Sequence, residues 1–118
     1  MLPVCTNNTY SCKERKLALH DAMDILGGKW KVNILLQLLH YGSLRFKDLQ
    51  ENLAGITPKV LTKDLQELEM NLLVTRTVNK TKPVTVSYTL TAHAHSMWDV
   101  INGILEFGIL HRKVIKEQ

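Results

Sequence analysis

Hydrophobic and polar positions along the chain follow a helical period over most of its length and a strand period in one segment. A first helix is predicted over residues 16–27, where apolar side chains recur every three or four positions until two glycines end the pattern. A second helix is predicted over 29–41, and its wide apolar face is typical of a largely buried helix. Between 43 and 46 apolar and polar residues alternate, which indicates a brief strand or an extended link.

A pair of helices is predicted next, a short one over 47–53 and a longer one over 57–70, separated by a tight turn. Thr57 has the hydroxyl that suits an N-cap, and Pro58 suits the first helical position because its missing N–H would have no partner there. The longer helix carries leucines spaced by four, three and four residues, which predicts one apolar stripe in the core: Leu61, Leu65, Leu68 and Leu72.

After residue 71 the period changes from helical to alternating. Two strands are predicted over 74–78 and 84–90, joined by the charged turn 79–83, and together they indicate a β-hairpin. Thr91 is then expected to cap a final long helix over 92–116. The resulting order predicts an α+β, mainly α fold: a winged helix-turn-helix with a two-stranded wing and a long C-terminal dimerisation helix.

A chain of 118 residues falls within the usual range for one domain. The polar residues 1–15 are expected to form a flexible arm, and residues 16–118 a single winged-helix DNA-binding domain. No window approaches the roughly 18 consecutive apolar residues of a membrane span, and the N-terminus lacks the apolar core of a signal peptide. The protein is therefore expected to be soluble and cytoplasmic, with no membrane partner. A net charge of +4 suits a polyanionic partner without identifying one.

The predicted helix over 92–116 carries a wider apolar band than so small a domain needs for its own core, and it is expected to pack against the predicted helix over 16–27. Packing against a symmetry mate would bury that surface, so both are expected to be dimerisation helices of a homodimer. The alternative is a monomer whose last helix closes its own core. The side chains assigned to the dimer are Leu19, Met23, Met97, Trp98, Ile101, Ile104, Leu105 and Ile109.

The second helix of a helix-turn-helix enters the major groove and reads base edges with its N-terminal and outward residues. Here that is the helix from Thr57 to Met70, and its base-reading candidates are Thr57, Pro58, Lys59, Thr62, Lys63 and Gln66. Cations on either side of this helix are expected to contact phosphates or an adjacent minor groove, namely Arg45, Lys47, Lys80 and Lys82. A twofold dimer would hold two such helices about one DNA turn apart, matching an inverted-repeat operator in double-stranded DNA.

Several motifs, in order, carry a resemblance to a known family. They are Asp24-Ile25-Leu26-Gly27-Gly28-Lys29-Trp30, Leu44-Arg45-Phe46-Lys47-Asp48-Leu49, Gly55-Ile56-Thr57-Pro58-Lys59-Val60-Leu61-Thr62, Leu65-Gln66-Glu67-Leu68-Glu69 and Val86-Ser87-Tyr88-Thr89-Leu90-Thr91. Over about residues 18–108 the chain resembles the HxlR-type regulators, which are relatives of the MarR group. The resemblance implies a homodimeric, DNA-binding, one-component transcription regulator without enzymatic activity.

The chain departs from that family at one position. Many members have a cysteine thirteen residues before the tryptophan of the Gly-Gly-Lys-Trp run, and here that position is Leu17. The two cysteines of this chain, Cys5 and Cys12, lie further upstream and are too few for a disulfide framework. They are either incidental reduced thiols or an oxidant or electrophile sensor, because the basic residues that follow Cys12 favour a thiolate. The effector thus stays open between an oxidant and a small molecule.

Five histidines raise the question of a metal or catalytic site. His93 and His95 are two residues apart, which points them to different sides of a helix, and no third ligand has metal-site spacing. No nucleophile and base are assembled either, so neither a metal, nor a cofactor, nor enzyme activity is expected. A winged-helix module that binds a protein and no DNA is the remaining alternative.

Overall fold

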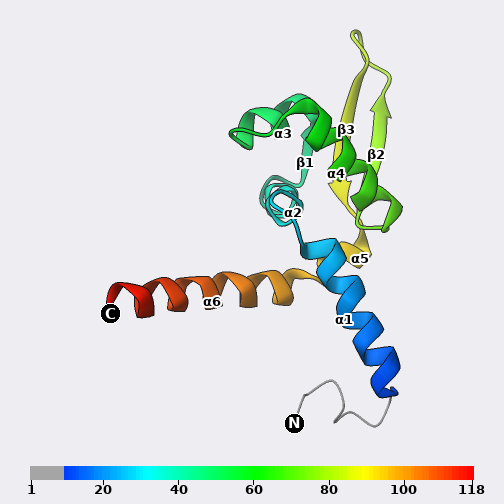
Figure 1. The fold of residues 1–118 in the computed structure, drawn as a ribbon. Coiled ribbons are helices and arrows are strands. Elements are labelled where there is room, and N and C mark those ends of the chain that lie inside the picture. Colours follow the sequence, from blue (N-terminus) through cyan, green and yellow to red (C-terminus); the bar gives the residue numbers. More distant parts are fainter. Residues whose placement is uncertain (1–9) are drawn as a thin grey trace.

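A computed structural model describes residues 10–118 (Figure 1). Its elements are α1 (Cys12–Leu26), α2 (Lys31–Tyr41), β1 (Ser43–Arg45), α3 (Phe46–Asn52), α4 (Pro58–Met70), β2 (Val74–Asn79), β3 (Thr85–Leu90), α5 (Ala92–His95) and α6 (Trp98–Lys116). The order confirms the expected fold class, a mainly helical winged helix-turn-helix with a long C-terminal helix. Within residues 10–118 no helix is both long and apolar enough to cross a bilayer.

The wing belongs to a three-stranded antiparallel sheet in the order β1-β3-β2. The strands β2 and β3 form the expected hairpin, and the brief strand β1 adds to the free edge of β3. Tyr88 of β3 lies between Leu44 of β1 and Arg76 of β2, and both Tyr88 and Leu44 are buried. The base of the wing is therefore fixed to the body of the domain, while its tip extends away from it (Figure 1).

The core is built around α2 and the inner face of α4. From α2 it takes Ile34, Leu35 and Leu38, from α4 Leu61, Leu65 and Leu68, and from the surrounding elements Leu44, Leu49, Leu53, Ile56, Leu73, Val74, Tyr88, Ala94 and Ile101. Burial of one leucine side chain contributes about 1.5–3 kcal/mol to stability, so α4 is held firmly by its leucine face. α2 is the largely buried helix that its apolar pattern predicts.

The first helix begins at Cys12, four residues before its expected start at 16. Ser11 caps it, because its hydroxyl accepts a hydrogen bond from the N–H of Glu14 over 3.1 Å. Ser-x-x-Glu is a sequence signature of a helix N-terminus, and the hydrophobic pattern alone does not reveal it. Residues 12–15 are therefore helical, and the expectation of a flexible arm over 1–15 is wrong for them; residues 1–9 lie outside the described part of the chain.

The apolar stripe of α4 ends earlier than its spacing predicts. The helix stops at Met70, and Leu72 takes a left-handed conformation with φ of 62°. Two hydrogen bonds close the end, from the N–H of Leu72 to the carbonyl of Glu69 and from that of Leu73 to Leu68, both 3.0 Å long. Leu72 is consequently 71% exposed while Leu73 is 1% exposed. The expectation that Leu72 belongs to the core is wrong, and Leu73 occupies that place.

The last helix is also not continuous over 92–116, because a turn separates α5 from α6. The hydroxyl and the N–H of Ser96 both donate to the carbonyl of His93, over 2.6 and 3.1 Å, and this local bonding ends α5. Ala94 is buried against the core and anchors α5, so α6 leaves the domain in a new direction.

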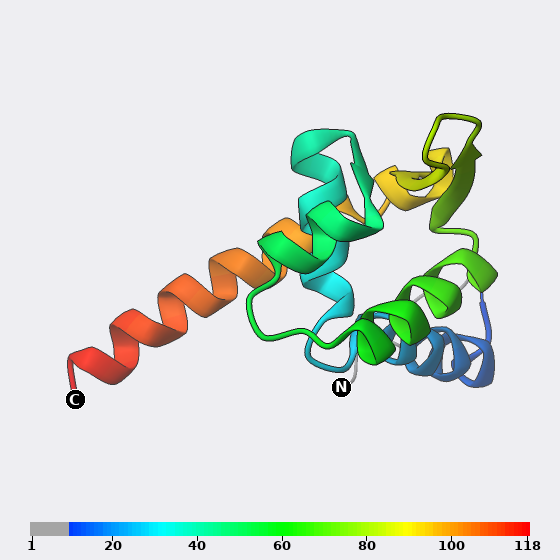
Figure 2. The same ribbon diagram turned by 90° about the horizontal axis from the view of Figure 1, so that it is seen from above.

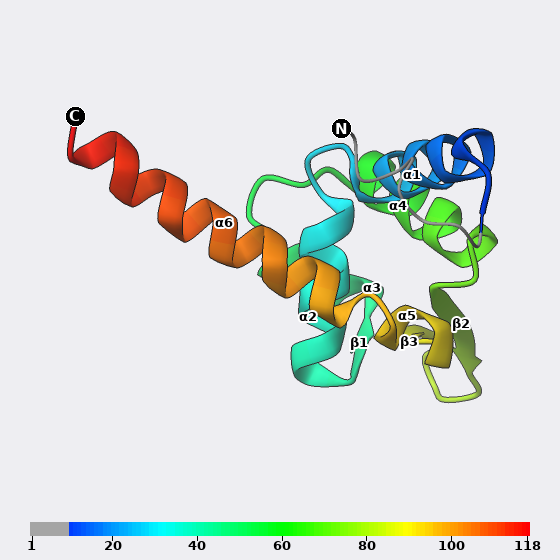
Figure 3. The same ribbon diagram turned by 90° about the horizontal axis from the view of Figure 1, so that it is seen from below.

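Both terminal helices extend from the domain with little packing of their own. α6 projects away from the other elements in every view (Figure 1; Figure 2; Figure 3). Along the whole of α1 no residue is buried, and along the whole of α6 Ile101 alone is. Large apolar side chains stay exposed on both helices, namely Leu17, Leu19, Met23, Trp98, Val100, Ile104, Leu105, Phe107, Ile109, Leu110, Val114 and Ile115.

Two expected dimer residues serve the core of their own chain instead. Ile101 is 5% exposed, and Met97 is partly buried against the same core. Both lie where α5 turns into α6, so they attach that helix to the domain. The expected dimer residues of α6 that stay exposed are Trp98, Ile104, Leu105 and Ile109.

The left-handed conformation of Leu72 predicts a stabilising substitution. A non-glycine residue in this region costs about 1 kcal/mol, and Leu72→Gly should raise the free energy of unfolding by up to about that amount. Met70→Gly, two residues earlier at the last residue of α4, is the matched control and should lower it by up to about 1 kcal/mol. Urea unfolding followed by circular dichroism measures both. A loss of stability in Leu72→Gly as large as in Met70→Gly would show that the leucine side chain matters more than the backbone strain.

Candidate nucleic-acid interface

The start of α4 is fixed by its cap. The Thr57 hydroxyl accepts a hydrogen bond from the N–H of Val60 over 3.2 Å, and Pro58 occupies the first turn. The sequence predicted both the cap at Thr57 and the place of Pro58 in the first turn. The cap orients the first turn of α4, and with it the residues expected to enter the major groove first.

The two faces of α4 differ completely in character. Its inner face is leucine, and the outer side carries the six residues that the sequence assigns to base reading, all of them exposed: Thr57, Pro58, Lys59, Thr62, Lys63 and Gln66. Within residues 10–118 neither Lys59 nor Lys63 forms an ion pair. Two ammonium groups, a hydroxyl and an amide thus share one accessible helix face, which is the set of donors and acceptors that reads base edges.

An ion pair joins one flank of α4 to α2. Lys31, which is largely buried, pairs with Glu67, and this contact lowers the pKa of Glu67 below its ordinary value. Burial raises the pKa of Asp64, one turn before Glu67, despite the nearby Lys31. The pair lies at the edge of the polar face, one helical turn after Lys63, and together with the buried leucines it fixes which side of α4 points outward.

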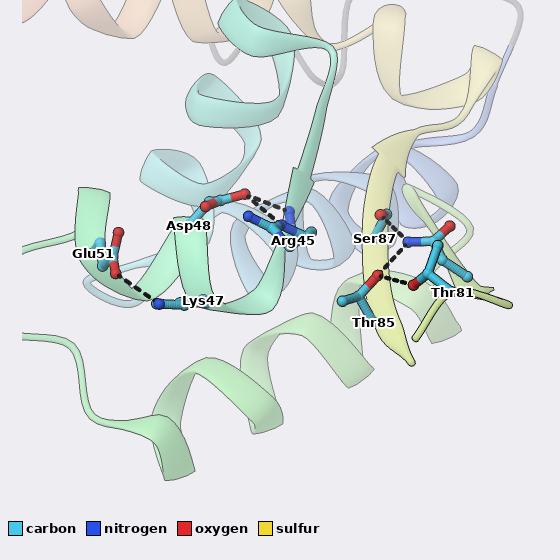
Figure 4. A network of polar contacts seen from close by, with 8 residues as sticks. Arg45, Lys47, Asp48, Glu51, Thr81, Thr85 and Ser87 are labelled. Carbon is cyan, nitrogen blue, oxygen red and sulfur yellow. Dashed lines mark hydrogen bonds and ion pairs between the residues drawn. The ribbon is translucent and has the colours of Figure 1, made fainter. Parts of the chain in front are cut away.

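The two expected phosphate-binding residues ahead of α4 already have anionic partners (Figure 4). The Arg45 Nε donates to the Asp48 carboxylate over 3.3 Å, and the backbone N–H of Arg45 donates to the same oxygen over 3.2 Å. Lys47 lies 3.9 Å from Glu51 in an exposed pair one helical turn apart. Such exposed pairs contribute little energy, so both cations can still exchange their partner for a phosphate. The spacing of Lys47 to Glu51, four residues apart in one predicted helix, was a signal in the sequence, whereas the contact of Arg45 with Asp48 belongs to the N-terminal cap of α3.

The wing tip is held by a small polar network (Figure 4). The side-chain amide of Asn79 donates to Thr85 over 3.0 Å and to Ser87 over 2.7 Å, and the Thr81 hydroxyl donates to the carbonyl of Pro83 over 2.8 Å. These bonds tie the two strands together at the point where the loop begins. Lys80 and Lys82, both exposed, are therefore carried on an ordered loop.

Arg76 is a candidate that the sequence analysis missed. It lies on β2 opposite Tyr88 and lines a groove between α4 and the wing together with Phe46, Thr62 and Gln66. It occupies the strand face whose neighbouring positions, Val74 and Val78, are apolar, and a charge inside such an alternation is the signal that could have revealed it. Its cation lies with two of the expected base-reading residues at one groove, which the carboxylate of Glu69 also lines.

Comparison with known proteins identifies the family. The model of the HxlR-like helix-turn-helix family matches residues 25–116. The chain belongs to the HxlR-like helix-turn-helix family. The HTH-type transcriptional regulator YtcD of Bacillus subtilis is 31% identical over 99 residues, which cover 84% of this chain and 78% of YtcD. This HxlR-like chain is accordingly a transcriptional regulator and not an enzyme, and its family implies DNA binding.

Solved structures agree with this assignment. The redox regulator HypR in its reduced form superposes with a TM-score of 0.78 at 29% identity, covering 86% of this chain and 99% of HypR. A MarR-family transcriptional regulator from Enterococcus faecalis V583 gives 0.79 at 27% identity, covering 96% and 99%. The reduced transcriptional regulator YodB from Bacillus subtilis gives 0.70 at 33%, covering 76% and 87%. HypR is also solved oxidised and YodB after diamide treatment.

The cysteine positions of this HxlR-like chain are only partly described. Cys12 is the first residue of α1 and is exposed, whereas Cys5 lies outside the described residues. Leu17, at the position where many relatives are expected to have a cysteine, is exposed on α1 as well. A thiol at Cys12 would therefore act about one and a half turns before that position on the same helix.

Proposed function

We propose that the protein is a homodimeric regulator that binds an inverted-repeat operator in double-stranded DNA, with α4 of each copy in a major groove. The observation that carries the proposal is the division of α4 into a buried leucine face and an exposed face with Lys59, Thr62, Lys63 and Gln66. A lysine donates to guanine acceptors, a glutamine pairs with adenine, and a threonine methyl contacts thymine. These contacts would supply sequence specificity.

Phosphate contacts would come from both sides of α4. Lys80 and Lys82 on the ordered wing tip reach an adjacent groove or backbone, and Arg45 and Lys47 contact phosphates before α4. Because Arg45 and Lys47 must first release Asp48 and Glu51, their share of the affinity is smaller than that of the wing lysines. Such contacts give affinity and salt dependence rather than sequence preference.

The homodimer is supported by the apolar surfaces of the terminal helices. On α6 the side chains of Ile104, Leu105 and Ile109 are 47%, 52% and 61% exposed, and on α1 those of Leu19 and Met23 are 54% and 58% exposed. Contiguous apolar surface of this kind marks an interaction site, and a twofold axis would bring the helices of two copies together. The dimer would fix the distance between the two α4 helices.

The DNA-reading role predicts two different defects. On fragments selected from a random double-stranded pool, Lys63→Ala should weaken binding by about 1–3 kcal/mol and relax the preference at one base pair of each half-site. Lys80→Ala should weaken binding evenly across fragments and lower the salt slope by about 1 per half-site. Lys116→Ala, at the end of α6, is the control and should change neither. Fluorescence anisotropy over a range of salt concentrations measures all three.

Failure to enrich any fragment from the pool would reject this role. The winged-helix module that binds a protein and no DNA would then be preferred. Equal affinity of Lys63→Ala and the unaltered protein for every fragment would reject α4 as the reading helix.

The dimer proposal predicts that charge on α6 separates the copies. Leu105→Glu with Ile109→Glu would bury two carboxylates in the apolar contact, which is costly, so the variant should sediment as a monomer. Its affinity for a two-half-site fragment should fall at least tenfold. Glu106→Lys, a charge change at an exposed residue about 100° around α6 from Leu105, is the control and should stay dimeric. A dimer that survives the double substitution would show that another surface holds the copies together.

A second candidate function is regulation by thiol oxidation. It is favoured by the similarity to HypR and by the exposed Cys12 on α1, one of the two helices proposed to form the dimer. An oxidant such as diamide takes two electrons and two protons from two thiols, which become a disulfide. A bond between Cys12 and a second thiol would constrain α1, and through it the spacing of the two α4 helices.

Diamide tests this candidate directly. The unaltered protein should change its operator affinity several-fold after treatment and recover it with dithiothreitol. Cys5→Ser with Cys12→Ser should keep its affinity under the same conditions. An equal change in the double variant would remove the thiols from the mechanism, and no change in either protein would reject oxidation as the signal.

A further inference from the structure

A groove lies between α4 and the wing, which contact one another (Figure 1), and its volume is about 520 Å³. α4 contributes Thr62, Gln66 and Glu69 to its walls, and the wing contributes Arg76 and Val86. Thr62 and Gln66 are also proposed to read bases, so the groove adjoins the face of α4 that would enter the major groove. It is therefore continuous with the proposed DNA interface.

The groove separates two parts of the chain that are proposed to enter different grooves of the DNA. α4 would enter the major groove, and the wing tip with Lys80 and Lys82 would reach the adjacent minor groove. In a duplex, one sugar–phosphate backbone runs between a major groove and the minor groove beside it. That backbone would therefore pass through the space between α4 and the wing.

Arg76 places an accessible cation in this groove. It lies on β2 opposite Tyr88 and is exposed. Within residues 10–118 Arg76 forms no ion pair, whereas Arg45 and Lys47 are paired with carboxylates. It can therefore bind a phosphate without first releasing an anionic partner, and a guanidinium can do so through two parallel hydrogen bonds.

The other walls of the groove differ in character. Phe46 and Val86 are half-buried and Tyr88 is buried, so together they line its base with apolar and aromatic surface. The C–H groups of a deoxyribose can pack there without leaving a polar group unpaired. Glu69, on the last turn of α4, adds a carboxylate that would repel a phosphate. A backbone in the groove would therefore place its phosphate at Arg76 and away from Glu69.

We propose that this groove holds the sugar–phosphate backbone of one DNA strand in each half-site, and that Arg76 binds one phosphate of that strand. Because phosphate contacts fix the register of a protein on the duplex, this contact would set the position of α4 along the major groove. The inference rests on the DNA-binding function proposed above. It adds a contact that neither the outer face of α4 nor the wing tip supplies.

A base contact is the competing interpretation of Arg76, since an arginine also pairs with guanine through two hydrogen bonds. Base edges are reached by an element that lies inside a groove of the DNA. Arg76 lies in the middle of β2, two residues after the buried Val74 and three before Asn79, where the strand ends. It is thus neither on the reading helix nor at the wing tip, and a backbone contact fits that position better.

Neutral phosphate analogues test the contact on a two-half-site fragment that the unaltered protein binds. Methylphosphonates replace the phosphates one at a time, at symmetry-related positions of both half-sites. At one position, between the base pairs contacted by α4 and the minor groove reached by the wing tip, the replacement should weaken binding of the unaltered protein about tenfold. It should weaken binding of Arg76→Gln by no more than about twofold, because that variant has already lost the contact. Lys80→Ala, which removes another cation of the wing, is the matched control and should stay sensitive at that position.

Substitutions on the two sides of the groove should have opposite effects on affinity. Arg76→Gln should weaken binding to every selected fragment by a similar factor, about tenfold, and lower the salt slope by about 1 per half-site. Arg76→Lys keeps the cation, so it should keep the salt slope and lose only part of the affinity. Glu69→Gln should strengthen binding about twofold, because it removes a carboxylate beside the phosphate. Circular dichroism melting verifies that all three variants are folded.

The outcomes separate a failure of this contact from a failure of DNA binding. If the unaltered protein binds no fragment, the function on which the inference rests is rejected, and the inference with it. If it binds DNA but Arg76→Gln is as sensitive to every methylphosphonate as the unaltered protein, the phosphate contact alone is overturned. A loss in Arg76→Gln that is confined to fragments with one particular base pair would show that Arg76 reads a base. Weaker binding by Glu69→Gln would show that the groove does not hold a phosphate.

Discussion

Burial of the leucine face of α4 is the contact on which the rest of the structure depends. Leu61, Leu65 and Leu68 lie against α2 and the sheet, and their burial fixes the rotation of α4 about its own axis. A helix is rigid, so one buried side determines which residues occupy the other. The ion pair of Lys31 with Glu67 holds the same orientation from the edge of the contact. The face of α4 that is proposed to contact DNA is therefore set by apolar packing on the opposite face of the helix.

The molecule divides into a well-packed reading unit and two helices that lack partners. The sheet, α2, α3 and α4 share one core, whereas α1 and α6 leave most of their apolar side chains exposed. Hydrophobic burial is the main stabilising term in folding, so the proposed dimer would be stabilised by covering these side chains. Association of two copies would both stabilise such a regulator and bring two α4 helices together.

Periodicity predicted most of the fold because the helical and strand repeats follow directly from which side chains are buried. The order of elements, the cap at Thr57 and the exposed face of α4 followed from it. Periodicity did not predict where the elements end, because their ends depend on local hydrogen bonds. Ser96 ends α5 by bonding to His93, and the hydrogen bonds after Met70 turn Leu72 outward. Arg76 was missed because its role depends on α4 and the wing lying side by side, which no local pattern contains.

The attachment of α6 has a consequence for how such regulators diversify. Since, within residues 10–118, α6 joins the core through Ile101 and the neighbouring Met97, its direction depends on a joint that contains none of the proposed base-reading residues. Substitutions at that joint would alter the separation of the two half-sites that a dimer recognises and leave the recognised bases unchanged. In the proposed dimer, operator spacing and operator sequence would thus evolve independently, through different parts of one short chain.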